Sequence, residues 1–137
     1  MKGRILLALA AAVLAGCLFG CAGSDRRIEY RRSGGFAGFD DRLVIAEDGK
    51  STLTRRSQRY EFTLDEDSLK SLQGLFETAR FSQLSKEYLP SQPGADLFEY
   101  ILTYQGHTVR TLDGAVPEAL QPILEALNRI VADQGQP

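Results

Sequence analysis

Residues 97–104 read LFEYILTY, and side chains along such a segment alternate between the two faces of an extended strand. One face is wholly apolar or aromatic, and the other carries leucine and isoleucine at half of its positions. A strand that is apolar on both faces is normally covered on both sides. The segment therefore predicts a strand in the centre of a sheet, paired along both edges. Its wholly apolar face consists of Phe98, Tyr100, Leu102 and Tyr104.

Five further segments have the composition or alternation of strands. They are residues 27–31, 41–46, 51–55, 59–64 and 107–112. Two dipeptides between them have turn chemistry: Asp48-Gly49 supplies the positive φ of a tight hairpin, and Gln105-Gly106 is a two-residue connection. The connections are short and suit antiparallel neighbours, and no βαβ alternation is long enough for a parallel sheet.

A first helix is predicted to begin at Asp65, whose side chain can cap the free N–H groups of the first turn. Thr63 with Glu66 forms an alternative capping box, which would move the boundary by about two residues. The apolar residues that follow recur at helical spacing and predict a stripe facing the core. They are Leu69, Leu72, Leu75, Phe76 and Ala79.

A second helix is predicted to begin near residue 118, after Pro117, because Pro122 is tolerated only within the first turn of a helix. Residues 88–96 contain two prolines and a glycine and predict an irregular loop. The sequence therefore predicts an α+β fold, in which a single antiparallel β-sheet of about five to six strands is packed by two α-helices. The expected order is β-β-β-β-α-β-β-α.

The sequence predicts an N-terminal signal segment, because the basic residues Lys2 and Arg4 precede a short apolar run. This run is too short to cross a hydrocarbon core of about 30 Å. Residues 14–17 read LAGC, a bacterial lipobox, which predicts cleavage before Cys17 and attachment of diacylglycerol to its thiol. Cys21 is the alternative lipidation site. A disulfide between the two cysteines is the other reading, and it would constrain very little chain.

Acyl chains contribute about 0.8 kcal/mol for each buried methylene, so two or more of them hold a protein stably on a bilayer. We therefore expect a lipid-anchored protein of the bacterial cell envelope. The outer membrane is favoured where one exists, because Leu18 stands where many lipoproteins of the inner membrane have aspartate. The predicted organisation is a signal peptide at 1–16, a tether at 17–26, one domain at 27–131 and a tail at 132–137.

The mature chain is expected to be acidic. Cleavage after residue 16 removes two of the 16 basic residues and none of the 18 acidic ones, which leaves 14 against 18 and a formal charge of −4. This balance argues against nucleic acid as a partner. Arginines gather at 26–27 and 31–32, where they either meet anionic headgroups or form a solvated strand face, and the solvated face is favoured.

We find no convincing catalytic set in the sequence. His107 is the single histidine and is expected at the surface, so metal sites and nucleophilic triads built on imidazole lack parts. The consecutive acids at 65–67 are explained by the positive end of a helix dipole. Residues 34–38 are rich in glycine but lack the GxxxxGK[ST] order of a phosphate-binding loop. We expect neither enzymatic activity nor a bound cofactor or metal.

An unusual segment follows the first predicted strand. It comprises Arg32, Ser33, Gly34, Gly35, Phe36, Ala37, Gly38 and Phe39. Glycine permits positive φ and close approach of other backbone. The two phenylalanines are either plugs in the core of the domain or anchors for a partner, and physical chemistry alone favours plugs.

The heptad at residues 32–38 resembles the signature of the emfourin family, small bacterial proteins whose namesake inhibits protealysin, a thermolysin-like zinc metalloprotease. The leucine-rich helix, the loop and strand at 93–104 and the terminal helix fit the same layout, so the resemblance covers about residues 27–131. It implies a protein that occludes the cleft of a secreted or envelope metalloprotease without itself being an enzyme. The main alternative is a structural or assembly lipoprotein that binds another protein, and a ligand-binding lipoprotein is a third reading.

Overall fold

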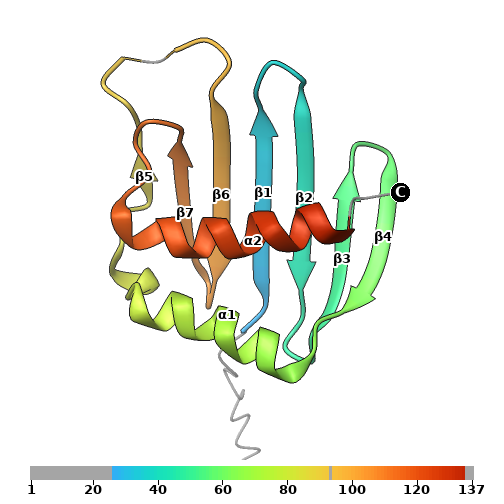
Figure 1. Cartoon of the computed structure of the whole chain (residues 1–137). Coiled ribbons are helices and arrows are strands. Elements are labelled where there is room, and N and C mark those ends of the chain that lie inside the picture. Colours follow the sequence, from blue (N-terminus) through green and yellow to red (C-terminus); the bar gives the residue numbers. More distant parts are fainter. Residues whose placement is uncertain (1–25, 93, 135–137) are drawn as a thin grey trace, which may run out of the picture.

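The computed structural model describes residues 26–92 and 94–134. Seven strands form one sheet, and both α-helices lie on the same face of it (Figure 1). The helices are α1 Glu66–Thr78 and α2 Gln121–Gln134, with short 3-10 helices η1 Phe81–Gln83 and η2 Glu118–Leu120. The strands are β1 Ile28–Gly34, β2 Phe39–Ile45, β3 Lys50–Arg55, β4 Gln58–Thr63, β5 Glu87–Tyr88, β6 Phe98–Tyr104 and β7 His107–Leu112.

The strand order is β4-β3-β2-β1-β6-β7-β5, and every neighbouring pair is antiparallel except β5 with β7. The predicted α+β class is confirmed, whereas the predicted strand count and the purely antiparallel sheet are wrong. The additional strand, β5, is two residues long and overlaps the segment predicted to be irregular. It is held by β7, since Arg110 N–H donates to Lys86 O at 2.8 Å and the Arg110 guanidinium lies 2.6 Å from the Glu87 carboxylate. A strand of two residues is too short to show the alternation of apolar and polar residues by which strands are predicted.

The central position predicted for the 97–104 segment is confirmed. β6 pairs with β1 along one edge and with β7 along the other, so that Leu102 lies beside Tyr30 and Val109. These three side chains are buried beneath the helices. Among the described residues, the buried core cluster runs from Ile28 to Val131.

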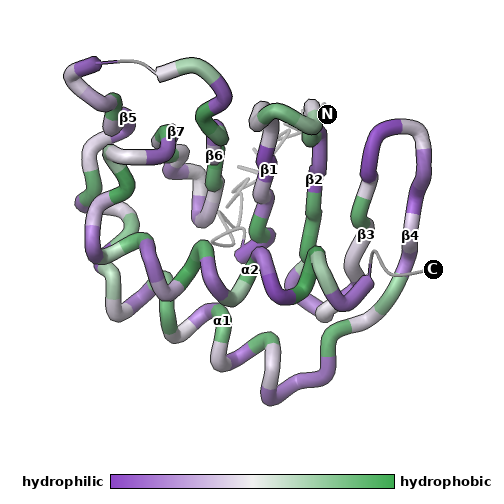
Figure 2. The backbone as a smooth tube through the Cα atoms, turned by 45° about the horizontal axis from the view of Figure 1, so that its top comes forward, coloured by the Kyte–Doolittle hydropathy of each residue, from purple (hydrophilic) through white to green (hydrophobic). Residues whose placement is uncertain are grey.

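The helices cover this core with amphipathic faces, and Figure 2 shows hydrophilic and hydrophobic residues alternating along both of them. α1 buries Leu69, Leu72 and Phe76, three residues of its predicted stripe. The predicted cap at Asp65 is confirmed, because its carboxylate accepts the Ser68 N–H at 2.9 Å. The Ser68 hydroxyl also donates to this carboxylate, at 2.6 Å, and the two bonds from Ser68 lower the pKa of Asp65.

The second helix begins three residues later than predicted. Residues 118–120 form η2, and α2 starts at Gln121, which keeps Pro122 within the first turn. A proline there lacks only an N–H that would have no partner within the helix. The helix also continues to Gln134, beyond the expected end of the domain at residue 131.

The helices do not cover the whole face of the sheet. α2 crosses the strands near their middle and α1 lies toward one end, so the opposite end of the sheet extends beyond α2 (Figure 1). That end carries the β1–β2 connection, the start of β6 and the predicted signature segment. The predicted signal peptide at 1–16 and the two candidate lipidation sites, Cys17 and Cys21, lie outside the described residues.

Candidate functional site

The connection between β1 and β2 is a tight turn at the uncovered end of the sheet. We call residues 35–39 the β1–β2 tip. Positive φ values occur at Gly34 (99°), Gly35 (69°) and Gly38 (61°). Gly38 N–H donates to Gly35 O at 3.0 Å and closes the turn. Three glycines of the signature therefore occupy backbone conformations that other residues rarely adopt.

Two of these glycines also allow close contact with the chain entering β6. Gly35 N–H donates to Leu97 O at 3.3 Å. A Cβ at Gly34 would lie 2.4 Å from that same oxygen, and a Cβ at Gly35 would lie 2.8 Å from the Phe98 ring. The fold therefore requires glycine at positions 34 and 35, since a side chain at either position would push the tip away from β6.

The two phenylalanines of the tip differ in their surroundings. Phe36 is 94% exposed, so the favoured reading of a plug is wrong for this residue. Phe39 is 37% exposed and packs against Phe98, with ring centroids 5.5 Å apart and planes inclined by 56°. Phe39 therefore braces the base of the tip, while Phe36 presents nearly its whole ring to solvent.

Arg32 lies beneath this aromatic pair. Its guanidinium carbon is 4.9 Å from the Phe39 ring centroid and 5.7 Å from that of Phe98, within the range of cation–π attraction. Its Nε is buried with no hydrogen-bond partner among the described residues, while its two terminal nitrogens are bonded. Arg32 thus ties the aromatic base of the tip to polar groups below it.

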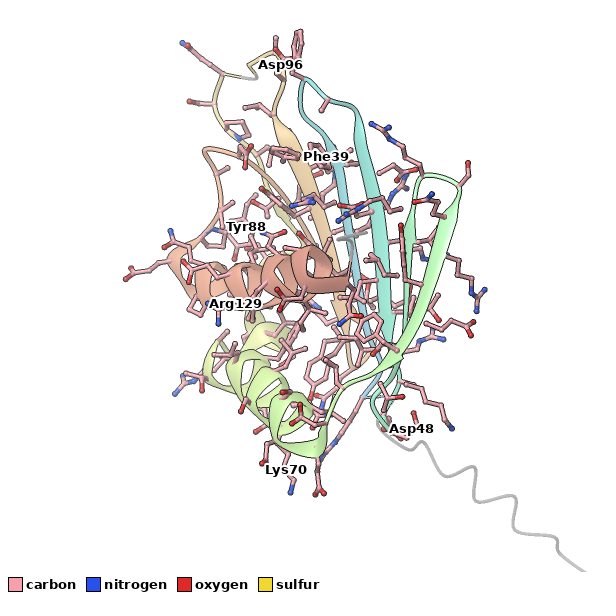
Figure 3. All side chains as sticks on the ribbon, turned by 45° about the vertical axis from the view of Figure 1, so that its right-hand side comes forward. Phe39, Asp48, Lys70, Tyr88, Asp96 and Arg129 are labelled. Carbon is pink, nitrogen blue, oxygen red and sulfur yellow. The ribbon has the colours of Figure 1, made fainter. Side chains whose placement is uncertain are left out.

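Asp41 is the centre of these polar groups. It is fully buried and accepts from Arg32 Nη2 at 2.6 Å through one oxygen and from Arg55 Nε at 2.8 Å through the other. Arg55 also donates to Val131 O of α2 at 3.2 Å. Figure 3 shows Phe39 on the part of the sheet that extends beyond α2. A buried carboxylate with two arginines is compensated in charge and holds three elements in register.

Asn128 of α2 connects the helix to the same cluster. Its Oδ1 accepts from the Tyr30 hydroxyl at 2.7 Å and from Arg32 Nη1 at 3.1 Å. Burial raises the pKa of the Tyr30 hydroxyl, which therefore stays protonated and donates this bond. The helix is thereby fixed against the residues that support the tip.

The start of β6 is fixed by a second carboxylate, Asp113. One of its oxygens accepts from Phe98 N–H at 3.0 Å and the other from the Tyr100 hydroxyl at 3.1 Å. Burial, together with the nearby charge of Asp113, raises the pKa of Tyr100 to about 12. This pair holds the backbone beside which the tip packs.

A hollow of about 440 Å³ lies between β2 and the β3–β4 turn, on the side of the tip away from β6. It is lined by Phe39, Asp41, Arg55 and Arg56, among others. Arg56 also donates to Ala37 O of the tip at 3.0 Å. The tip is therefore hydrogen-bonded on both sides, to the chain before β6 and to the β3–β4 turn.

The remaining residues singled out in the sequence do not join this cluster. His107 lies on β7, between β6 and β5, with Nε2 3.0 Å from Leu84 O and its ring 5.6 Å from that of Phe81. His107 was expected at the surface, and its side chain is half-buried. Within residues 26–92 and 94–134 no three or more His, Cys, Asp or Glu side chains are grouped as metal ligands, and no helix has the length and apolarity to cross a membrane.

Sequence reasoning missed the residues that support the tip. Asp41 and Arg55 read as ordinary polar residues at the ends of predicted strands, and Asn128 lies among apolar helix positions. The signal that could have found Asp41 is its alternation with Leu43 and Ile45, which places it on the buried face. A carboxylate on that face requires a partner, and arginines stand at the ends of both neighbouring strands.

No protein-family model matches the chain, and no curated protein matches it in sequence.

Proposed function

We propose that this chain is a lipid-anchored inhibitor of a thermolysin-like zinc metalloprotease, and that the β1–β2 tip enters and occludes the protease cleft. The resemblance of residues 32–38 to the emfourin signature suggests the class of target. The observation that carries the proposal is Phe36, which is 94% exposed on a tip braced from several sides. An aromatic side chain that is held in solvent on a braced turn can serve as an anchor that fills a pocket on a partner.

The rigidity of the tip suits inhibition better than cleavage. Its backbone is bonded to Leu97 O, and Arg56 bonds to Ala37 O. Because the tip is ordered before binding, little conformational entropy is lost when Phe36 enters a pocket. The same bonds oppose the extended conformation that a cleaved segment must adopt. The chain therefore blocks the cleft as a folded body.

The decisive experiment measures protease inhibition by residues 22–137, which retain every residue of the buried core cluster. Thermolysin-like proteases should be inhibited stoichiometrically, and Phe36→Ala should raise the inhibition constant by at least about 30-fold, the effect of losing a hot-spot side chain worth about 2 kcal/mol. Leu89→Ala is the matched control, because Leu89 is also a large exposed apolar residue, at 50%, but lies beyond β5. The Leu89→Ala variant should inhibit as strongly as the parent chain.

Two results would contradict the proposal. Undiminished turnover across a broad set of thermolysin-like proteases would show that the chain is not an inhibitor of this class. Equal inhibition by the parent chain and Phe36→Ala would show that the tip does not contribute to inhibition. Recovery of envelope assembly proteins and no protease from a pull-down would instead support the structural lipoprotein.

The lipid anchor is a separate part of the proposal with its own test. Incorporation of labelled fatty acid into the full chain should be lost in Cys17→Ser and retained in Cys21→Ser. The reverse pattern would move the anchor to Cys21, and labelling of neither cysteine would remove the anchor.

A further inference from the structure

The two edges of the sheet are not equivalent. β5, at one edge, contributes two residues and is followed closely by Pro90, so it offers little for another strand to pair with. β4, at the other edge, is six residues long, and no described helix or strand lies beyond it (Figure 1). A strand edge of this length presents a row of unpaired backbone groups.

The outward-facing groups of β4 can be identified from one hydrogen bond. Leu64 N–H donates to Gly49 O at 3.0 Å, one position beyond the last pair of the β3–β4 register. Antiparallel partners exchange such bonds only at alternate positions. Counting back in steps of two, Tyr60 directs its N–H and C=O toward β3. Arg59 and Glu61 therefore direct theirs away from the sheet.

We propose that β4 is a self-association edge, at which a second copy of this chain pairs antiparallel about a two-fold axis at Tyr60. In that register Arg59 lies opposite Glu61 of the partner subunit, and Glu61 lies opposite Arg59 of the partner subunit. The residues with outward backbone groups thus meet each other and form four main-chain hydrogen bonds across the axis. Tyr60 faces Tyr60 of the partner subunit on the side of the helices.

The charges of Arg59 and Glu61 favour this register over those in which the two-fold axis is shifted by one position. The side chains of Arg59 and Glu61 are both exposed and already form an ion pair within the chain at 2.8 Å. Pairing about Tyr60 adds the same two residues of the partner subunit, so that four side chains of alternating charge lie next to one another. A two-fold axis at Arg59 or at Glu61 would instead place like charges directly opposite each other, which destabilises a strand pair. An axis between two residues would mix the two faces of the sheet.

The interface is small. Stable specific interfaces bury about 1,200–2,000 Å², more than the edges of two six-residue strands provide. The dimer is therefore weak in dilute solution and is favoured when the chains are concentrated. It leaves the β1–β2 tip free, because the tip lies at the end of the sheet and not along its β4 edge (Figure 1). The inference therefore does not depend on the proposed function.

Cysteine crosslinking tests the register directly. The two cysteines of the chain are at positions 17 and 21, so residues 22–137 contain none. Opposed residues at a non-hydrogen-bonded position have Cα atoms about 4.5 Å apart, within the range that a disulfide spans. Tyr60→Cys should form a disulfide dimer under mild oxidation at least about tenfold faster than Gln58→Cys or Phe62→Cys. These controls lie on the same face of β4, but each is four positions away from its own copy in the partner subunit.

Charge reversal supplies the second arm. In the Tyr60→Cys background, Glu61→Arg should slow crosslinking at least about tenfold, and Arg59→Glu combined with Glu61→Arg should restore it. Equal crosslinking at positions 58, 60 and 62, or failure of the double reversal to restore it, would overturn the register. Circular dichroism checks that each variant folds. Independently, sedimentation of residues 22–137 should show dimer in the high micromolar range, and a strictly monomeric chain at 1 mM would overturn the proposal.

Discussion

Replacing Asp41 by asparagine should be one of the most damaging single changes to the stability of this protein. The carboxylate is fully buried and receives one arginine at 2.6 Å and another at 2.8 Å. The amide keeps the size of the side chain but removes its charge, so Arg32 and Arg55 lose their common counter-ion. Removing one partner of a buried ion pair costs about 3–5 kcal/mol.

The structure places the expected loss at the lower end of that range. The side chains of Arg32 and Arg55 are 17% and 26% exposed, and each keeps a neutral acceptor on α2. Partial access to water and these acceptors offset some of the lost attraction. We expect a loss of about 3 kcal/mol in the free energy of unfolding, which at a slope of about 1.5 kcal/mol per molar urea lowers the unfolding midpoint by about 2 M.

Urea unfolding of residues 22–137, followed by far-ultraviolet circular dichroism, measures this loss. Asp40→Asn is the matched control, since Asp40 is adjacent but 57% exposed and pairs with the exposed Arg31 at 3.2 Å. Exposed pairs contribute about 0–1 kcal/mol, so the control should unfold close to the parent. A loss below about 1 kcal/mol for Asp41→Asn, or equal losses for the two variants, would refute the reasoning.

Two further predictions concern the tip and the start of β6. Gly35→Ala should lower the free energy of unfolding by about 2–3 kcal/mol, since it combines positive φ with a Cβ 2.8 Å from Phe98. Gly38→Ala adds only the strain of its positive φ and should cost about 1 kcal/mol. Chemical unfolding of both variants should give this order, and equal losses would contradict it. The folded Tyr100 has a pKa of about 12 against about 10 when unfolded, so its contribution to stability is fully present below pH 10 and is lost as the pH rises from 10 through 12. Unfolding midpoints across this range should fall more steeply for the parent than for Tyr100→Phe, and parallel curves would contradict the assignment.

The parts of the fold that were predicted correctly have strong local signals. The central strand was recognisable because its two faces are both largely apolar, and the cap at Asp65 because capping depends on residues within one helical turn. These features are set by near neighbours in the sequence. The class of fold follows from their order along the chain.

The features that were missed depend on contacts between distant segments. β5 exists because β7 offers an edge to residues 87–88, which have no pattern of their own. The exposure of Phe36 follows from the docking of Gly34 and Gly35 against Leu97, more than sixty residues away in the sequence. Composition alone favours burying a phenylalanine, and only the tertiary contact reverses that preference.

The hydrogen bonds that join the tip to the chain before β6 and to the β3–β4 turn are accepted by main-chain carbonyls. Leu97 contributes its carbonyl oxygen and Ala37 accepts Arg56 through its own carbonyl, so neither contact depends on the identity of the side chain at 97 or 37. The ring of Phe36 points into solvent and takes no part in the brace. Positions 36 and 37 can therefore be randomised while the frame stays intact, which makes this fold a scaffold for displaying short recognition sequences.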